Sequence, residues 1–115
     1  MKTNHGEKTL TLLGTKGGPA LRTPGVSFLP TSNLLCLGQR KIIIDCGIGV
    51  TQALVRAGHS ASAITDIFIT HLHSDHVLEL GGLIHTAWTS GLQHQLVVRG
   101  PAGTARVWSH FLEMM

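Results

Sequence analysis

The sequence predicts a single α/β domain in which helices cover a sheet. Three observations support this fold class. The first half of the chain contains short apolar runs of strand length with glycine-containing turns between them. The second half alternates strand-like runs with apolar residues at helical spacing. The length of 115 residues, with 43% hydrophobic and 13% charged residues, is typical of one folded domain and not of a disordered chain.

Composition also limits the partners and the location that we expect. The formal net charge of +3 is scattered, and the longest basic run is the pair Arg40-Lys41, which is weak support for a nucleic-acid partner. No run approaches the roughly 18 apolar residues of a membrane helix, and residues 1–13 lack the apolar core of a signal peptide. We therefore expect a cytoplasmic protein with no membrane partner. The low charged fraction suggests that part of the surface packs against another subunit or further chain.

The first strands are expected to be antiparallel. Residues 9–13 predict a strand followed by a glycine-rich loop, whose spacing matches neither common phosphate-binding pattern. Residues 33–37 and 41–45 predict a hairpin, because Gly38-Gln39 suits a two-residue type II′ turn.

The hairpin register decides how the two cysteines are interpreted. The predicted turn pairs Leu37 with Arg40 and Cys36 with Lys41, so Cys46 lies far from Cys36 along the ladder. Bridged Cα atoms must lie within about 7 Å, so we expect no disulfide between them. Both cysteines are interpreted as small core residues.

The rest of the chain is expected to alternate helices and strands. In order, the sequence predicts a helix over 50–57, a strand over 64–70 buried on both faces, a helix over 77–88, a strand over 96–99 and a helix over 107–115. Gly58 is a plausible end for the first helix. The pair Gly81-Gly82 either weakens the second helix or permits close packing beside it.

The most specific feature is the H-x-H-x-D-H motif at residues 71–76. Imidazole nitrogens and carboxylate oxygens are the usual ligands of zinc and related divalent ions. If the preceding strand continues, His71 and His73 lie on one face and can reach one ion together, while Leu72 points into the core. Asp75 and His76 follow on a turn and diverge, which suits a second ion.

The remaining histidines are interpreted mostly as surface or packing residues. His5, His59, His94 and His110 stand singly, without a carboxylate nearby in the sequence. His85 lies nine residues beyond the motif on a predicted helix and is also interpreted as a non-ligand.

Asp45 ends the second strand of the predicted hairpin and allows two interpretations. It is either a turn or cap carboxylate, or a partner that orients a metal-bound histidine.

Three segments together resemble the metallo-β-lactamase superfamily: Asp45-Cys46-Gly47, residues 67–76, and Gly100-Pro101-Ala102-Gly103. The opening Leu13-Gly14-Thr15 and the Gly-Pro-x-Gly turn are most similar to the branch that contains tRNase Z and related arylsulfatase-like hydrolases. The resemblance implies an αββα sandwich with two metal ions, usually zinc, although a mixed donor set also accepts manganese or iron.

The same resemblance implies the roles of the motif residues. His71 and His73 would bind the first ion, Asp75 and His76 the second, and Asp75 is also the catalytic candidate. Metal lowers the pKa of its water to about 7, so hydroxide can attack an ester or phosphodiester bond. The implied partner is therefore a small-molecule ester or phosphodiester, with RNA as a further candidate. A tRNase Z typically has glycine where Ser74 stands. Because of this departure, 3′-processing of tRNA is an alternative function and not the leading one.

The resemblance also predicts that the chain carries only the N-terminal half of the fold. Three further ligands of the superfamily, two histidines and a bridging aspartate, come from a later half, and this chain has no aspartate after Asp75. We expect an unpaired sheet edge, an apolar sheet face and assembly with a second copy, unless the chain is a fragment. The other alternative is a truncated, inactive metal-binding or interaction module.

Overall fold

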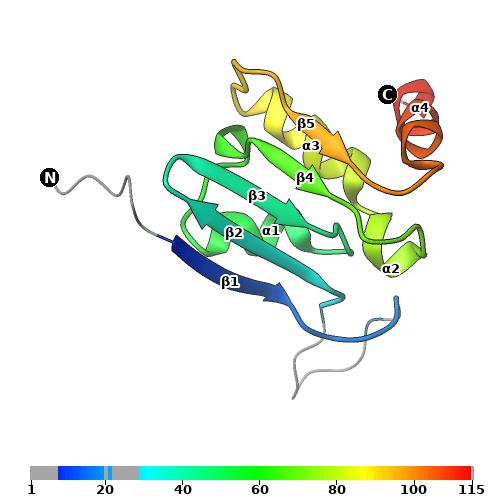
Figure 1. The fold of residues 1–115 in the computed structure, drawn as a ribbon, viewed down its shortest axis with the longest axis horizontal. Helices are drawn as coiled ribbons and strands as arrows, with labels where there is room; N and C mark the ends of the chain where they lie inside the picture. Colours follow the sequence, from blue (N-terminus) through cyan, green and yellow to red (C-terminus); the bar gives the residue numbers. More distant parts are fainter. Residues whose placement is uncertain (1–7, 20, 22–28, 115) are drawn as a thin grey trace, which may run out of the picture.

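The chain forms one mixed sheet with helices against one face (Figure 1). The structure is a computed structural model that describes residues 8–19, 21 and 29–114. In chain order the elements are β1 (Lys8–Gly14), β2 (Ser32–Leu37), β3 (Arg40–Ile44), α1 (Val50–Arg56), the 3₁₀-helix η1 (Ala61–Ala63), β4 (Asp66–Phe68), α2 (Ser74–Val77), α3 (Leu80–Thr89), β5 (Val97–Arg99) and α4 (Thr104–Met114). The predicted α/β class and the predicted order of elements are confirmed.

The sheet order β1-β2-β3-β4-β5 follows the chain. The first three strands are antiparallel, whereas β3, β4 and β5 are parallel. The predicted hairpin register is confirmed, since Leu37 pairs with Arg40 and Cys36 with Lys41. Gly38 has φ 62°, as the first central position of a type II′ turn requires. Both cysteines are free, and Cys46 is fully buried in the core.

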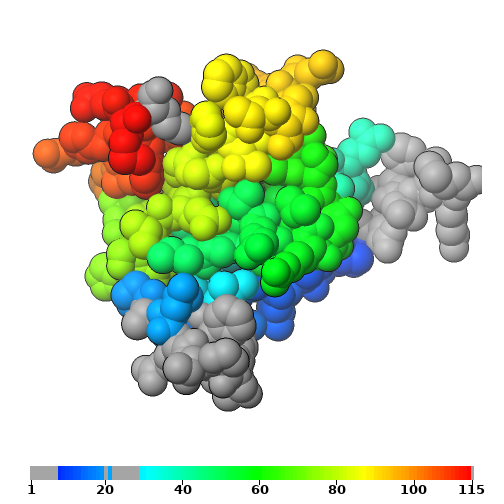
Figure 2. All heavy atoms as spheres, turned by 180° about the vertical axis from the view of Figure 1, so that it is seen from behind, coloured from blue at the N-terminus to red at the C-terminus, as the bar shows by residue number. Residues whose placement is uncertain are grey.

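The core lies between the sheet and the helices behind it. Leu34, Ile43 and Ile67 occupy the same face of successive strands and are completely buried. They belong to one apolar cluster with Leu54 of α1 and Leu83 of α3. Figure 2 shows this side of the molecule, with the helices over the sheet and β1 appearing only along the lower margin. This core holds the strand ends on which the candidate site is built.

The sheet face away from the helices is open, which contradicts one prediction. The run 64–70 was predicted to be buried on both faces, but β4 covers only three residues and Phe68 is 36% exposed. Leu10 and Leu12 of β1 are 60% and 63% exposed. The described helices cover only one face of the sheet, so an apolar run here alternates between the core and the open face. The predicted apolar sheet face without a partner is present in the described part of the chain.

The second predicted helix is divided into α2 and α3. The close-packing interpretation of the glycine pair is confirmed for Gly81, because a Cβ there would lie 2.5 Å from a ring carbon of Phe111 in α4. Trp88 was predicted on the buried stripe of this helix and is instead 67% exposed, since the buried face of α3 follows Leu80, Leu83 and Ala87. No helix among the described residues is long and apolar enough to cross a membrane.

Candidate metal centre

The motif occupies the connection between β4 and α2, at the carboxyl end of the parallel strands (Figure 1). The predicted strand alternation over residues 71–73 is wrong, because β4 ends at Phe68 and residues 70–73 are not in a strand. Its consequence still holds for Leu72, which packs against the core. A Cβ at Gly103 would lie 2.8 Å from Leu72, so the Gly-Pro-Ala-Gly turn packs directly beneath the motif.

Three of the four predicted ligands come together. His71, Asp75 and His76 each offer one ligand atom, and these atoms lie within 4.8 Å of one another. The rings of His71 and His76 have centroids 3.8 Å apart, and Asp75 Oδ2 lies 3.4 Å from His76 Nε2. Two imidazoles and a carboxylate at this spacing form a donor set that fits a divalent cation.

His73 lies beside this group but outside it. Its ring is edge-on to that of His71, with centroids 4.7 Å apart, and its side chain is exposed. The backbone explains this position, because His73 is the N-cap of α2 with φ −66° and ψ 150°. The first helical turn then carries Asp75 and His76 toward His71.

Asp45 is in direct contact with the motif. Its Oδ2 lies 2.7 Å from His76 Nδ1. An ionised carboxylate can only accept a hydrogen bond, so this contact favours the His76 tautomer with its proton on Nδ1, in which Nε2, 3.4 Å from Asp75 Oδ2, has a lone pair for a cation. Asp45 has φ 67°, a left-handed conformation that a residue with a side chain adopts at a cost of about 1–3 kcal/mol. Asp45 therefore lies in a left-handed turn and contacts a predicted ligand, and its role in orienting a metal-bound histidine stays a prediction.

Thr70 is a site residue that the sequence reasoning missed. Its backbone N–H donates to Asp45 Oδ1 at 2.8 Å, and its hydroxyl donates to Asp45 Oδ2 at 2.7 Å. These bonds satisfy the buried carboxylate, which is only 4% exposed, and fix the oxygen that faces His76. The only signal in the sequence is that Thr70 immediately precedes the motif, and that signal does not identify its partner 25 residues away.

Cys46 is close to the site in sequence but is not a candidate ligand. Burial raises the pKa of its thiol, and the nearby charges of Asp45 and Glu79 raise that pKa further. Metal coordination requires the thiolate, which this environment disfavours. The interpretation of Cys46 as a core residue is confirmed.

Two single histidines have structural contacts. His94 Nε2 lies 2.7 Å from the carbonyl oxygen of Ile64. His59 Nδ1 lies 3.0 Å from Lys41 Nζ, and burial together with the lysine charge lowers the pKa of His59. Neutral His59 can accept a hydrogen bond from the ammonium group. Both contacts fit the prediction that these residues are not ligands.

The other single histidines also lie outside the ligand group. His85 is exposed on α3 next to Trp88, with ring centroids 5.8 Å apart. His110 lies on the exposed side of α4, 4.0 Å from Glu113. His5 is outside the described residues. Within the described ranges, no second group of three potential metal ligands is found.

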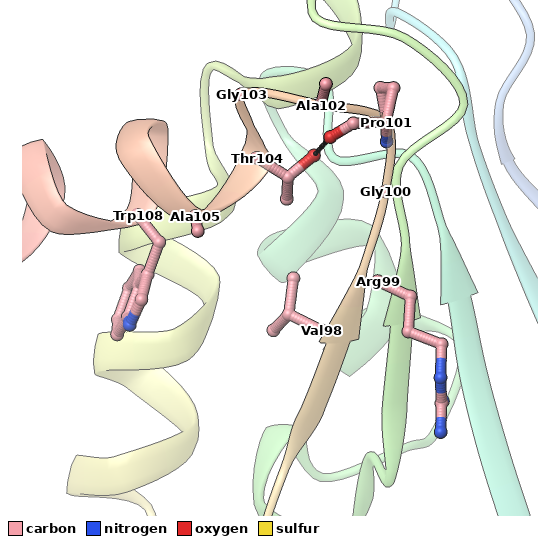
Figure 3. A pocket seen from close by; sticks show the side chains of 9 residues that line it. All are labelled: Val98, Arg99, Gly100, Pro101, Ala102, Gly103, Thr104, Ala105 and Trp108. Atoms are coloured by element: carbon pink, nitrogen blue, oxygen red, sulfur yellow. Dashed lines mark hydrogen bonds between the residues drawn. The ribbon is translucent and has the colours of Figure 1, made fainter.

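A cavity of about 650 Å³ lies between β5 and the start of α4 (Figure 3). Its walls include Val98, the turn at residues 100–103 and Trp108. The hydroxyl of Thr104 donates to the carbonyl of Pro101 at 2.8 Å and closes the turn. None of the predicted metal ligands lines this cavity, so the candidate centre is the surface group on the β4–α2 connection.

Solved structures with the same fold define the class of protein. Human tRNase Z, short form, is 34% identical, with a TM-score of 0.74 over 91% of this chain and 38% of that chain. The metallo-beta-lactamase fold protein YhfI from Bacillus subtilis is 25% identical, with a TM-score of 0.70 over 87% of this chain and 39% of that chain. The resemblance predicted from the sequence is therefore confirmed, for the metallo-β-lactamase fold and for the tRNase Z branch.

Residues 9–115 match the family described as "Anti-Pycsar protein Apyc1", and the chain belongs to this family. Among curated relatives, a ribonuclease Z of Mycobacterium bovis is 38% identical over 101 residues, which are 85% of this chain and 35% of that protein. A ribonuclease Z of Mycolicibacterium gilvum is 37% identical over 107 residues, which are 90% of this chain and 36% of that protein. The chain thus spans about a third of the length of these relatives.

Proposed function

We propose that this chain supplies part of the active site of a metal-dependent phosphodiesterase that acts on RNA. The observation that carries the proposal is the convergence of His71, Asp75 and His76, with His76 held through its Nδ1 by Asp45. Relatives named ribonuclease Z and tRNase Z support RNA as the substrate class. The small-molecule ester expected from the sequence has no such support among the named relatives.

Each residue has a distinct task in this proposal. His71 and His76 offer imidazole nitrogens, Asp75 offers a carboxylate oxygen, and exposed His73 lies close enough to His71 to join them. Asp45 keeps His76 in one tautomer and one orientation. A divalent ion bound by these groups, most simply zinc, would supply Lewis acidity toward a phosphate oxygen and lower the pKa of water to about 7.

The proposal includes a second ion, as the resemblance implies. Asp75 and His76 would hold it, with His71 and His73 at the first ion. The three further ligands implied by the resemblance are not among the candidate residues of this chain. We therefore assign to this chain four ligands of a two-ion site and the positioning of His76, and not a complete set of ligands.

The test combines metal binding with turnover. Zinc content and the zinc dissociation constant should be measured for the wild type, His71→Ala and Asp75→Ala, with His110→Ala as the control on an exposed histidine. Hydrolysis of a phosphodiester, a precursor tRNA and a carboxylic ester should be compared in the same preparations. We expect both site variants to bind zinc more weakly, and any phosphodiester turnover of the wild type to be lost in them. Unchanged zinc binding in both variants would refute the assignment.

A second candidate function, an interaction module without turnover, is favoured by the open sheet face. Leu10 and Leu12 lie there with more than half of their surface exposed. Apolar area of this kind commonly marks a contact surface. Light scattering of the wild type and of Leu12→Lys tests it, because a second copy on this face would make the wild type larger than a monomer and the variant monomeric. A monomeric wild type with phosphodiester turnover would exclude this alternative.

A further inference from the structure

The carboxylate of Glu79 caps a helix that has no cap of its own. Glu79 lies between α2 and α3, and its Oε1 accepts the backbone N–H of Gly49 at 2.8 Å, while Oε2 accepts that of Thr51 at 2.8 Å. Gly49 is the N-cap of α1 and has no side chain to offer, and the first turn of α1 contains no acidic residue. The free N–H groups of that turn therefore depend on a side chain from 28 to 30 residues away.

The backbone of Glu79 also contacts the loop between β3 and α1, at residues 45–49. Its N–H donates to the carbonyl of Cys46 at 3.0 Å, and the N–H of Cys46 donates to the carbonyl of His76 at 2.7 Å. Cys46 is thus held between the candidate ligand His76 and Glu79. It immediately follows Asp45, whose side chain contacts the ring of His76.

The loop between β3 and α1 has little freedom in this arrangement. A Cβ at Gly47 would lie 2.7 Å from the carbonyl oxygen of Asp75, so the loop backbone packs directly against α2. Asp45 is in a left-handed conformation that persists only where its surroundings impose it. The two bonds from the Glu79 carboxylate hold the far end of this loop, four to six residues beyond Asp45.

We propose that Glu79 is a positioning residue that fixes the loop at residues 45–49 and, through Asp45, the orientation of the His76 ring. The proposal rests on the proposed function only in treating His76 as a metal ligand. A simpler, competing role would be that Glu79 only stabilises α1. The two roles make different predictions, because only loss of a positioning residue would change which ring nitrogen of His76 carries the proton.

The main test replaces the carboxylate by an amide. Glu79→Gln keeps the size of the side chain, but its NH₂ group would face a backbone N–H, so one of the two bonds is lost. Long-range ¹⁵N spectra of the metal-free protein, at one alkaline pH where imidazole is neutral, report which ring nitrogen of His76 carries the proton. We expect the Nδ1–H form to predominate in the wild type and to decrease in the variant. We also expect the zinc dissociation constant, measured by chelator competition, to rise about tenfold.

Three further variants make the outcome decisive. Ala53→Gly destabilises α1 but keeps the backbone N–H that donates to the carbonyl of Gly49, and Glu113→Gln removes an exposed carboxylate on α4. Glu79→Asp keeps the charge and shortens the reach, so it takes the place of Glu79→Gln if that protein does not fold. The expected result is that only the Glu79 variants change the tautomer of His76.

Two results would overturn the proposal. One is a Glu79 variant with a lower melting temperature but with the His76 tautomer and the zinc affinity of the wild type. The other is an equal change of tautomer in Ala53→Gly at the same loss of melting temperature. A protein that binds no zinc, yet whose His76 tautomer responds to Glu79→Gln, would refute the proposed function and leave the positioning role intact.

Discussion

Two aspartates of similar burial have different partners: Asp45 follows β3 beside the carboxyl end of β4, and Asp66 begins β4 at its amino end. Asp45 is 4% exposed and Asp66 is 5% exposed. At the carboxyl end, Asp45 accepts hydrogen bonds from Thr70 and contacts His76. At the amino end, Asp66 lies 3.0 Å from the guanidinium of Arg40 and 3.1 Å from that of Arg99.

The difference in partners separates a site residue from a structural one. Arginine is always charged, so Asp66 is neutralised permanently, and its cluster joins β3, β4 and β5 on the open sheet face. Among the described residues, no arginine or lysine forms an ion pair with Asp45, and its carboxylate faces the imidazole of His76. A buried carboxylate without a permanent counterion is expensive to maintain, which is the pattern expected where function requires the charge. The two residues should therefore respond differently to the same substitution.

The largest effect is expected for Asp45→Asn, measured as zinc affinity. The amide keeps the size of the side chain but removes the charge that holds the His76 proton on Nδ1. Loss of such a partner weakens metal binding about 10- to 100-fold. Asp66→Asn is the matched control and should leave the zinc dissociation constant unchanged. Equal losses in the two variants would remove the distinction between the two aspartates.

The second-largest effect is expected for Asp66→Ala, measured as the free energy of unfolding. Asp66→Ala removes four charge-assisted hydrogen bonds, two from Arg40, one from Arg99 and one from the Thr65 hydroxyl at 2.7 Å. We expect a loss of about 1–2 kcal/mol in urea unfolding, because hydrogen bonds to charged groups are strong but both guanidiniums are half exposed. Glu113→Ala, on an exposed carboxylate, should show no measurable change. An equally small effect in both variants would mean that the cluster adds nothing to stability.

The pH dependence of that stability follows from the pKa of Asp66. Burial raises this pKa, but hydrogen bonds from Thr65 and the two arginines outweigh it and hold the pKa below its usual range. The unfolded carboxyl titrates near its ordinary value of about 3.9. The cluster therefore contributes fully above that pH, and its contribution is lost as the pH falls through the lower folded-state pKa. The difference between wild type and Asp66→Ala in unfolding free energy should shrink in acid, and a constant difference would contradict this account.

The smallest effect is expected for His59, the histidine with a lysine neighbour. Burial first, and then the charge of Lys41, lower the pKa of His59 in the folded protein. The unfolded imidazole binds its proton near pH 6.5, so stability should decline as the pH falls below that value toward the lower folded pKa. His59→Gln should flatten this part of the pH profile in thermal unfolding. His110→Gln, on an exposed histidine, serves as the control and should leave the profile as in the wild type.

Local patterns predicted much of the fold. The type II′ turn at Gly38 specified the hairpin register, and the helical spacing after Gly49 predicted α1, which ends just before Gly58. These features depend on neighbouring residues and on the backbone freedom of glycine, so they are visible in one short window. The prediction for residues 64–70 was wrong because burial depends on what covers each face of the sheet, and an apolar run does not carry that information.

The sequence by itself determined which side chains are the candidate metal ligands, since the H-x-H-x-D-H motif places three imidazoles and a carboxylate within six residues. Only the tertiary structure decided how that set is held. Asp45 reaches His76 across 31 residues, and Glu79 reaches the start of α1 across 28 to 30. The physical reason is that a single hydrogen-bonding side chain has no periodicity, so its partner becomes identifiable only when the sheet and the helices bring the two segments together.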